Sequence, residues 1–172
     1  MDAAYLNDLK DGYFAKDGFV KEGFMCTYSE AIANEFAETG LSNKQARNFF
    51  NRVNQYALLN KRKIMDIREA RANLLWLISL AFDKQKKGTN PGCFKTFLEK
   101  NVEAIHTDQD LAIFKIHFET ICNYMPEKKE NGPSNNTQGN SGKSQGGYHK
   151  PNNGYNGNRQ GNGGNNFSWK TR

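Results

Sequence analysis

A ridge of basic and amide side chains recurs at helical spacing after residue 42. Its members are Lys44, Arg47, Asn48, Asn51, Arg52 and Gln55, on the side of the predicted helix opposite Phe50 and Val53. Such side chains bond phosphate oxygens and sugar hydroxyls without reading bases. The ridge continues through Lys61, Arg62, Lys63 and Arg68. It predicts a contact with a nucleic-acid backbone; the alternative is an ordinary solvated helix face.

The distribution of charge also localises a basic surface. The 172 residues include 24 Lys or Arg and 18 Asp or Glu, a formal net charge of +6. Residues 1–40 carry 3 basic and 8 acidic side chains, residues 41–87 carry 11 and 3, and residues 88–126 carry 3 and 5. Positive charge in the nearly neutral segment 1–126 is therefore concentrated in one predicted helical hairpin.

Residue types that ordinarily perform catalysis or bind metals form no pattern. The histidines (His106, His117, His149) and cysteines (Cys26, Cys93, Cys122) lack ligand spacing. No Gly-rich phosphate loop, GxSxG or HExxH occurs. We expect no catalytic residue, metal or cofactor, so a nucleic-acid-processing enzyme ranks last among the function classes. His117 is expected to face solvent or a seam between subunits.

Five helices between residues 27 and 126 are predicted to position these side chains. Residues 27–30 and 42–45 have the spacing of capping boxes, which open helices. Apolar residues then recur with the 3.6-residue period, and Gly40, Gly88, Asn90-Pro91 and Pro126 mark helix ends. The third helix spans roughly residues 65–86, and the last two begin near residues 91 and 107. No segment alternates with period two, so we predict an all-α bundle of five to six helices.

The third predicted helix is apolar around most of its circumference. Ile67, Leu74, Ile78 and Ala81 make one face, while Trp76 and Leu80 lie nearly opposite. A helix of this kind is normally buried all round, so we predict that Trp76 and Leu80 belong to the core. The alternative is a patch for a neighbouring subunit. Arg71 lies between Ile67 and Ile78, where it is either a buried ion-pair partner or part of a functional surface.

The two ends of the chain differ from this helical body. In residues 2–25 an Asp-Gly-aromatic pattern repeats, and its glycines predict an extended arm or turn whose aromatics dock on the bundle. Residues 127–172 contain 11 Asn and 10 Gly but no Ala, Val, Ile, Leu or Met. Such a segment cannot bury enough apolar area to fold, so we predict a helical domain over 1–126 and a disordered tail over 127–172.

The expected location is the cytoplasm. The longest dense apolar run, residues 74–82, is far shorter than the about 20 residues that span a membrane. Residues 1–4 show no basic region leading into an apolar one, as a secretory signal would. We therefore expect no membrane partner.

Two segments resemble a known family, the small helical subunit of type III-A CRISPR effector complexes (the Csm small subunit). Residues 41–50, Leu-Ser-Asn-Lys-Gln-Ala-Arg-Asn-Phe-Phe, are similar to the family's Leu-Thr-Thr/Ser-x-Gln-Leu/Ile-Arg-x-Phe-Tyr, with Gln45 and Arg47 in register. Residues 114–124 are similar to its closing Phe-x-x-(aromatic)-x-Glu-Ala-(aliphatic)-(aliphatic)-Ala-Tyr. The family's third helix tends to end in Ala-Tyr-Ala-x-Gly-Arg, which this chain lacks; Lys84 is the nearest substitute for that arginine.

The resemblance implies a non-catalytic subunit of an RNA-guided antiviral complex. Its expected partners are guide RNA and target RNA, the backbone and large subunits, and other copies of itself, stacked along the guide–target duplex. The nuclease activities belong to the other subunits. The motif match implies that Arg47 touches the nucleic-acid backbone, and helix geometry extends the contact to Lys44 and Arg52.

A function of another class starts from the tail. Its aromatics Tyr148, Tyr155, Phe167 and Trp169 alternate with basic residues, a pattern suited to weak single-strand contacts by stacking and charge. The alternative function is therefore a free-standing RNA chaperone or condensate-forming RNA-binding protein. A solubilising tail without an essential role is the simpler interpretation of the same residues.

Overall fold

Six α-helices and one 3₁₀ turn make up residues 1–127, the part of the chain that this computed structural model describes. They are α1 (Ala3–Lys10), η1 (Glu22–Phe24), α2 (Thr27–Glu38), α3 (Asn43–Lys61), α4 (Ile67–Lys86), α5 (Gly92–Ala104) and α6 (Asp108–Tyr124). No β-strand occurs among these residues, so the predicted all-α class and five- to six-helix bundle are confirmed. Residues 128–172, with the aromatics of the predicted tail, lie outside the described residues. The boundary at residue 126 stays a prediction.

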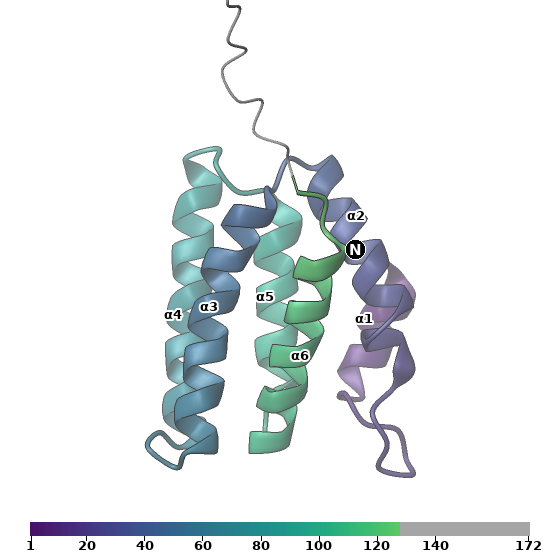
Figure 1. Ribbon diagram of the computed structural model, residues 1–172, viewed down its shortest axis with the longest axis vertical. Helices are drawn as coiled ribbons and strands as arrows, with labels where there is room; N and C mark the ends of the chain where they lie inside the picture. Colours follow the sequence, from purple (N-terminus) through teal and green to yellow (C-terminus); the bar gives the residue numbers. More distant parts are fainter. Residues whose placement is uncertain (128–172) are drawn as a thin grey trace, which may run out of the picture. The chain divides into compact units, whose positions relative to one another are not determined.

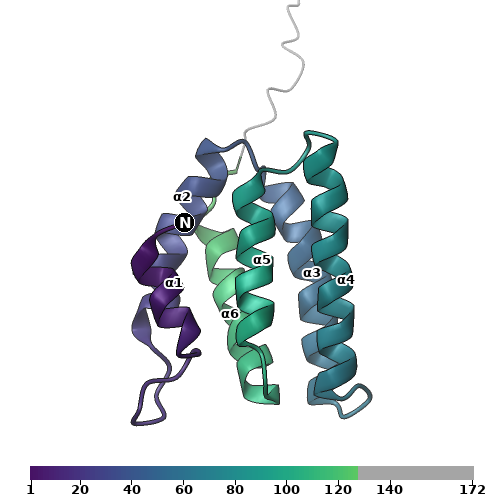
Figure 2. The same cartoon turned by 180° about the vertical axis from the view of Figure 1, so that it is seen from behind.

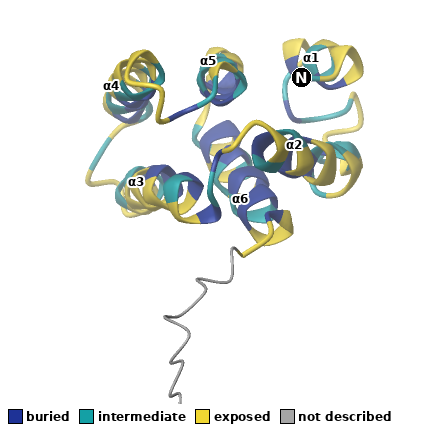
Figure 3. Cartoon of the chain, turned by 90° about the horizontal axis from the view of Figure 1, so that it is seen from above, coloured by how far each residue is buried: buried dark blue, intermediate teal, exposed yellow. Residues whose placement is uncertain are grey.

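The helices of residues 1–127 form two layers of three. Seen along the helices, α4, α5 and α1 make one layer and α3, α6 and α2 the other (Figure 3). Contacts join α3 with α4 and α6, α2 with α5 and α6, and α5 with α1 and α4. Figures 1 and 2 show α3 and α4 side by side at one edge. Both helices of the basic hairpin therefore have fewer helical neighbours than α5, which contacts α1, α2 and α4.

Side chains cap the starts of α1, α3, α4 and α6, whereas α2 and α5 begin without a side-chain cap. Ser42 caps α3 with Gln45 as predicted, and Thr107 caps α6 with Asp110. Asp66 and Glu69 form a further capping box at α4. The capping box predicted at residues 27–30 is wrong, because α2 follows η1 directly and its N-cap, Cys26, makes no side-chain bond. There the Glu30 N–H instead donates to the Cys26 carbonyl at 3.0 Å.

Aromatic rings fill the space between the two layers. Phe94 and Phe97 on α5 and Phe114 and Phe118 on α6 are fully buried, in agreement with the 3.6-residue apolar period predicted for these helices. Phe97 and Phe118 meet edge to face with ring centroids 5.2 Å apart. Such pairs add about 0.5–1.5 kcal/mol beyond the area they bury. The centre of the bundle is therefore an aromatic α5–α6 seam.

The N-terminal segment differs in part from the predicted extended arm. Residues 3–10 form α1, capped by Asp2, because Tyr5 and Leu9 share a helix face that packs inward. Residues 11–21 contain only a single antiparallel bridge between Phe14 and Val20. The predicted docking of aromatics is confirmed for Tyr13 and Phe24, which are fully buried, and is wrong for Phe19, which is 74% exposed.

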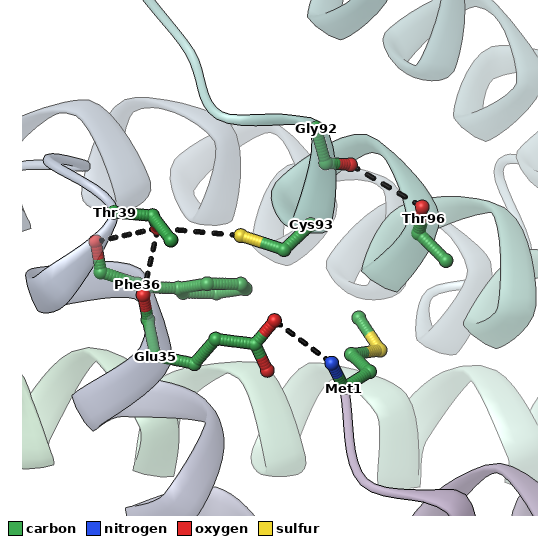
Figure 4. Close-up of polar contacts among 7 residues, drawn as sticks. All are labelled: Met1, Glu35, Phe36, Thr39, Gly92, Cys93 and Thr96. Carbon is green, nitrogen blue, oxygen red and sulfur yellow. Dashed lines mark hydrogen bonds and ion pairs between the residues drawn. The ribbon is translucent and has the colours of Figure 1, made fainter.

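Polar contacts hold this segment and the start of α5 against α2 (Figure 4). The amino group of Met1 lies 2.8 Å from Oε1 of Glu35 on α2. On the same helix, the Thr39 hydroxyl lies 3.3 Å from Sγ of Cys93 on α5. Burial raises the pKa of the Cys93 thiol, so it remains protonated near neutrality. These contacts join α1, α2 and α5.

His117 is buried, so the prediction that it faces solvent or a subunit seam is wrong. Its Nδ1 lies 2.6 Å from the Phe24 carbonyl oxygen and 3.0 Å from Oγ of Ser29. Because a carbonyl only accepts, the neutral ring carries its proton on Nδ1. Burial lowers the pKa of His117 to about 4, against the smaller opposing effect of the bond to Phe24. His117 therefore links α6 to η1 as a neutral core residue.

Candidate nucleic-acid interface

The outer face of α3 presents the first part of the predicted ridge to solvent. Lys44, Arg47, Asn48, Asn51 and Arg52 are all exposed, and Gln55 lies among them. The inward face consists of Ala46, Phe49, Phe50 and Val53, which are buried. No Asp or Glu occurs over residues 39–65, so this helix contributes no carboxylate to the surface. The helix therefore separates an apolar face from a polar face that can donate to anions.

Arg47 lies on the edge of α3 next to α6. Its Nε donates to Oδ1 of Asn43 at 2.8 Å, and Nη2 donates to Oδ1 of Asn123 at 3.2 Å. Both acceptors are neutral amides, so the charge of the guanidinium is not neutralised by them. Asn43 in turn donates to the carbonyls of Cys122 and Met125. Arg47 is thus an exposed, oriented cation at the α3–α6 boundary.

Arg52 lies on the opposite edge of α3, next to α4. Its guanidinium carbon is 5.3 Å from the ring centroid of Trp76. A cation over an indole ring is held in place by the electrostatics of the ring, without a carboxylate partner. None of the ion pairs among residues 1–127 includes Arg52. Its charge therefore also remains available to a ligand.

The ridge side chains of α3 lie at three positions across its outer face. Lys44, Asn48 and Asn51 occupy the middle of the outer face, Arg47 one edge and Arg52 the other. Lys84 on α4 joins Arg52 and Asn48 in a cleft of about 280 Å³ between α3 and α4. The structure thus brings Lys84 to the α3 surface.

The basic turn between α3 and α4 lies at the other end of the hairpin. Lys61, Arg62, Lys63 and Arg68 are all exposed there. Lys63 is 2.6 Å from Oδ2 of Asp108, and this bond, with a second from Asn60, lowers the pKa of that carboxyl. Arg68 is 3.8 Å from Asp66. Lys63 and Arg68 are therefore partly neutralised, whereas the ion pairs of the described residues include neither Lys61 nor Arg62.

Trp76 is half exposed, so the prediction that it belongs to the core is wrong. Its side chain is 50% accessible, and Leu75 and Phe82 on the same helix are also exposed. Leu80 is partly buried against the core. The reason is that α4 lies at the edge of its layer, with neighbours only toward α3 and α5. Arg71 is half-buried and makes no ion pair with a described residue, so it is not a buried ion-pair partner.

We expect Trp76→Ala to lower the free energy of unfolding by less than about 1 kcal/mol, the cost of an exposed cation–π pair. A buried Trp would cost about 3–5 kcal/mol. Leu77→Ala is the matched control, because Leu77 is the next residue but is buried. It should cost about 2–5 kcal/mol. Chemical denaturation of both variants tests the pair, and a Trp76→Ala loss as large as that of Leu77→Ala would contradict the exposed position.

Gln45 and Asn90 are two cleft residues that the sequence did not indicate as functional. The sequence places Gln45 in the capping box and in the family motif, and Asn90 only at a helix boundary before Pro91. In the structure both line the α3–α4 cleft. Nε2 of Gln45 donates to the Thr89 carbonyl at 2.8 Å, which ties α3 to the α4–α5 turn. Sequence patterns within one helix do not indicate that these two residues share a cleft, because this depends on a contact between segments far apart in the chain.

A metal site and a membrane-spanning helix are both absent from residues 1–127. No cluster of three or more His, Cys, Asp or Glu side chains suited to a metal ion occurs in this range. Within the same residues, no helix has the length and apolar character needed to cross a membrane. The basic and amide side chains gather on the exposed α3 face and in the adjoining cleft, which together form the candidate site.

The fold and this site define a small helical protein with one basic, solvent-exposed helix face. The family model for Csm2 Type III-A matches residues 23–130, and the chain belongs to that family. It is therefore a small structural subunit of a type III-A CRISPR effector complex. The match includes α3, α4 and the cleft between them. No curated protein and no solved structure matches the chain significantly.

Proposed function

We propose that this subunit lies along the guide–target RNA duplex of its effector complex, takes no part in catalysis, and binds the RNA backbone through the outer face of α3. The observation that carries the proposal is the exposed set Lys44, Arg47, Asn48, Asn51 and Arg52, in a stretch without a carboxylate. An α-helix rises 1.5 Å per residue, so a helix of 19 residues follows about 28 Å of a neighbouring strand.

The arginines and the asparagines of this face would make different kinds of contact with RNA. Arg47 and Arg52 offer planar forks that bond two phosphate oxygens at once, which lysine cannot do. The amides of Asn48 and Asn51 can donate to and accept from the 2′-hydroxyl group that distinguishes RNA from DNA. None of these contacts reads a base edge in the duplex. Binding of paired RNA should therefore be salt-dependent and nearly independent of sequence.

The test is the double variant Arg47→Ala/Arg52→Ala, reconstituted with the partner subunits and guide RNA. We expect weaker retention of target RNA and a log–log salt slope smaller in magnitude by up to about 2, since each phosphate contact adds about −0.9 on B-DNA and less on single strands. Target cleavage should become slower, but the cleavage positions in the RNA should not change, because the catalytic group would lie on another subunit. Each substitution should change the free energy of unfolding by no more than about 0.5 kcal/mol.

The matched control is Lys10→Ala/Lys16→Ala, which removes the same charge from exposed positions of the N-terminal segment. It should leave RNA retention and the salt slope unchanged. Equal losses in both double variants would assign the effect to net charge and contradict a localised site. Deletion of residues 128–172 separates the alternative function, because loss of RNA binding on that deletion alone would favour a chaperone acting through the tail.

A further inference from the structure

The cleft between α3 and α4 has a polar and basic lining. Its volume is about 280 Å³, just below the range of about 300–1,000 Å³ that is usual for ligand pockets. Gln45, Asn48 and Arg52 come from α3, Leu80 and Lys84 from α4, and Asn90 from the turn that follows. None of the residues lining it is acidic. The cleft therefore combines three amides and two cations with an apolar wall.

Asn90 is the unusual member of this set. Its side chain is 5% exposed, and no hydrogen-bond partner for either its Nδ2 or its Oδ1 lies among the described residues. An unpaired buried amide is costly and rare in native proteins, so each instance requires an explanation. The carboxamide can turn toward the cleft without losing a hydrogen bond, because it makes none with those residues. It then presents one donor and one acceptor side by side.

The carboxamide of Asn90 is not needed to hold its own turn. The backbone N–H of Asn90 donates to the Lys84 carbonyl at 3.3 Å, and the Thr89 N–H donates to the same oxygen at 2.9 Å. Gln45 holds the turn from the other side through the Thr89 carbonyl. No hydrogen bond within residues 1–127 therefore gives the amide group of Asn90 a structural role.

The two cations of the cleft are also uncommitted. The ion pairs among the described residues include neither Lys84 nor Arg52. Arg52 is placed over the Trp76 ring, which orients its guanidinium without neutralising it. The nearest acidic neighbour of Lys84 in sequence, Asp83, is paired with Lys87 at 2.7 Å. A ligand that fits must therefore carry an anionic group and a planar hydrogen-bonding group.

We propose that this cleft binds one unpaired nucleotide of an RNA strand, with the phosphate on Arg52 and Lys84 and the base edge on the Asn90 carboxamide. The Watson–Crick edge of every base has a donor next to an acceptor, which an amide can match in one of its two orientations. The apolar wall at Leu80 suits the face of the base. The inference rests on the proposed function, because it places an unpaired nucleotide beside the strand that α3 binds.

The experiment compares the full chain on three fluorescently labelled RNA duplexes at low salt. One is fully paired, one carries a single-nucleotide bulge, and one carries an abasic bulge. We expect the wild type to bind the bulged duplex about tenfold more tightly than the other two, within the range of a specific base contact. Asn90→Ala should abolish this preference and leave affinity for the paired duplex unchanged.

Two controls distinguish a ligand contact from a folding defect. Asn90→Ala removes an unpaired buried amide, so its melting temperature should equal or exceed that of the wild type. Asn34→Ala, which removes an exposed amide of α2 outside the cleft, should keep the preference for the bulge. Lys84→Gln should weaken binding of the bulged duplex more than that of the paired duplex.

Each other outcome overturns the inference in a recognisable way. Tight binding of the paired duplex without a preference for the bulge refutes the nucleotide site and leaves the proposed function standing. Equal binding of the abasic bulge means that the backbone kink, and not the base, is recognised. If Asn90→Ala binds all three duplexes like the wild type but no longer joins the partner subunits, the cleft is a protein interface. Absence of RNA binding by every form of the isolated chain rejects the nucleotide site, whereas the proposed function is decided by target retention in the reconstituted complex.

Discussion

Replacing Asn101 by leucine is expected to lower the free energy of unfolding by about 3 kcal/mol, because two buried hydroxyls lose their partner. Nδ2 of Asn101 donates to the Tyr5 hydroxyl at 2.7 Å, and the Tyr13 hydroxyl donates to Oδ1 at 2.8 Å. Burial raises the pKa of both tyrosines, so both remain neutral at ordinary pH. Denaturant unfolding monitored by circular dichroism measures the loss.

The control is a compensated variant in which both tyrosines become phenylalanine together with Asn101→Leu. Removing all members of a buried polar network costs much less than removing one, because no group is left unpaired. The compensated variant should therefore recover at least half of the lost stability. If Asn101→Leu alone unfolds like the wild type, the network does not hold the N-terminal segment on the bundle.

This hydrogen-bond network joins a part of the chain that the family model does not match to a part that it matches. Residues 1–22 lie outside the range that the family model matches, whereas Asn101 lies within it. Tyr5 and Tyr13 reach Asn101 from the N-terminal segment, and the amino group of Met1 pairs with Glu35 nearby. The segment is therefore an integral part of the described fold.

Features with a local cause could be predicted from the sequence. The capping box at Ser42 and Gln45 and the inward periodicity of Phe94 and Phe97 depend only on neighbours within one helix, and the structure has both. The exposure of Arg47 follows from its place on the same helical wheel. These features cover the helical body and the outer face of α3.

Features that depend on the packing of distant segments could not be predicted. Periodicity shows that the residues around Trp76 are apolar, but it does not show that α4 lies at the edge of a layer. His117 lies next to Phe118 and close to the apolar face of α6, yet its partner is a carbonyl 93 residues away. The cleft likewise exists only because the α4–α5 turn meets the start of α3, which brings Asn90 near Arg52.

Acidification is expected to destabilise the protein through His117 in the interval from pH 6.5 to about 4. An unfolded chain binds a proton on this ring with a pKa near 6.5, whereas burial lowers the folded pKa to about 4. Between these values the unfolded state holds more protons, so stability rises with pH. The contribution is complete above pH 6.5 and is lost as pH falls, by about 2 kcal/mol at pH 5 and about 3 kcal/mol at pH 4.

The geometry explains why the folded ring resists protonation. Nδ1 already donates to the Phe24 carbonyl, so an added proton must go to Nε2. Nε2 is buried and has no hydrogen-bond partner among the described residues, and the rings of Tyr5, Phe24 and Phe97 surround the imidazole. A positive charge there would have neither an acceptor nor water, and such burial costs several kcal/mol unless the group stays neutral.

Denaturant unfolding at pH 7, 6 and 5 measures this effect, a range in which most carboxylates stay ionised. The wild type should lose about 2 kcal/mol over the range, and His117→Gln, which cannot titrate, should lose much less. His106→Gln is the matched control, because His106 is exposed and its replacement should leave the wild-type slope in place. If the free energy of unfolding depended on pH in the same way for the wild type and His117→Gln, another group would cause the acid sensitivity. Neutral His117 would then not be what holds η1 against α6.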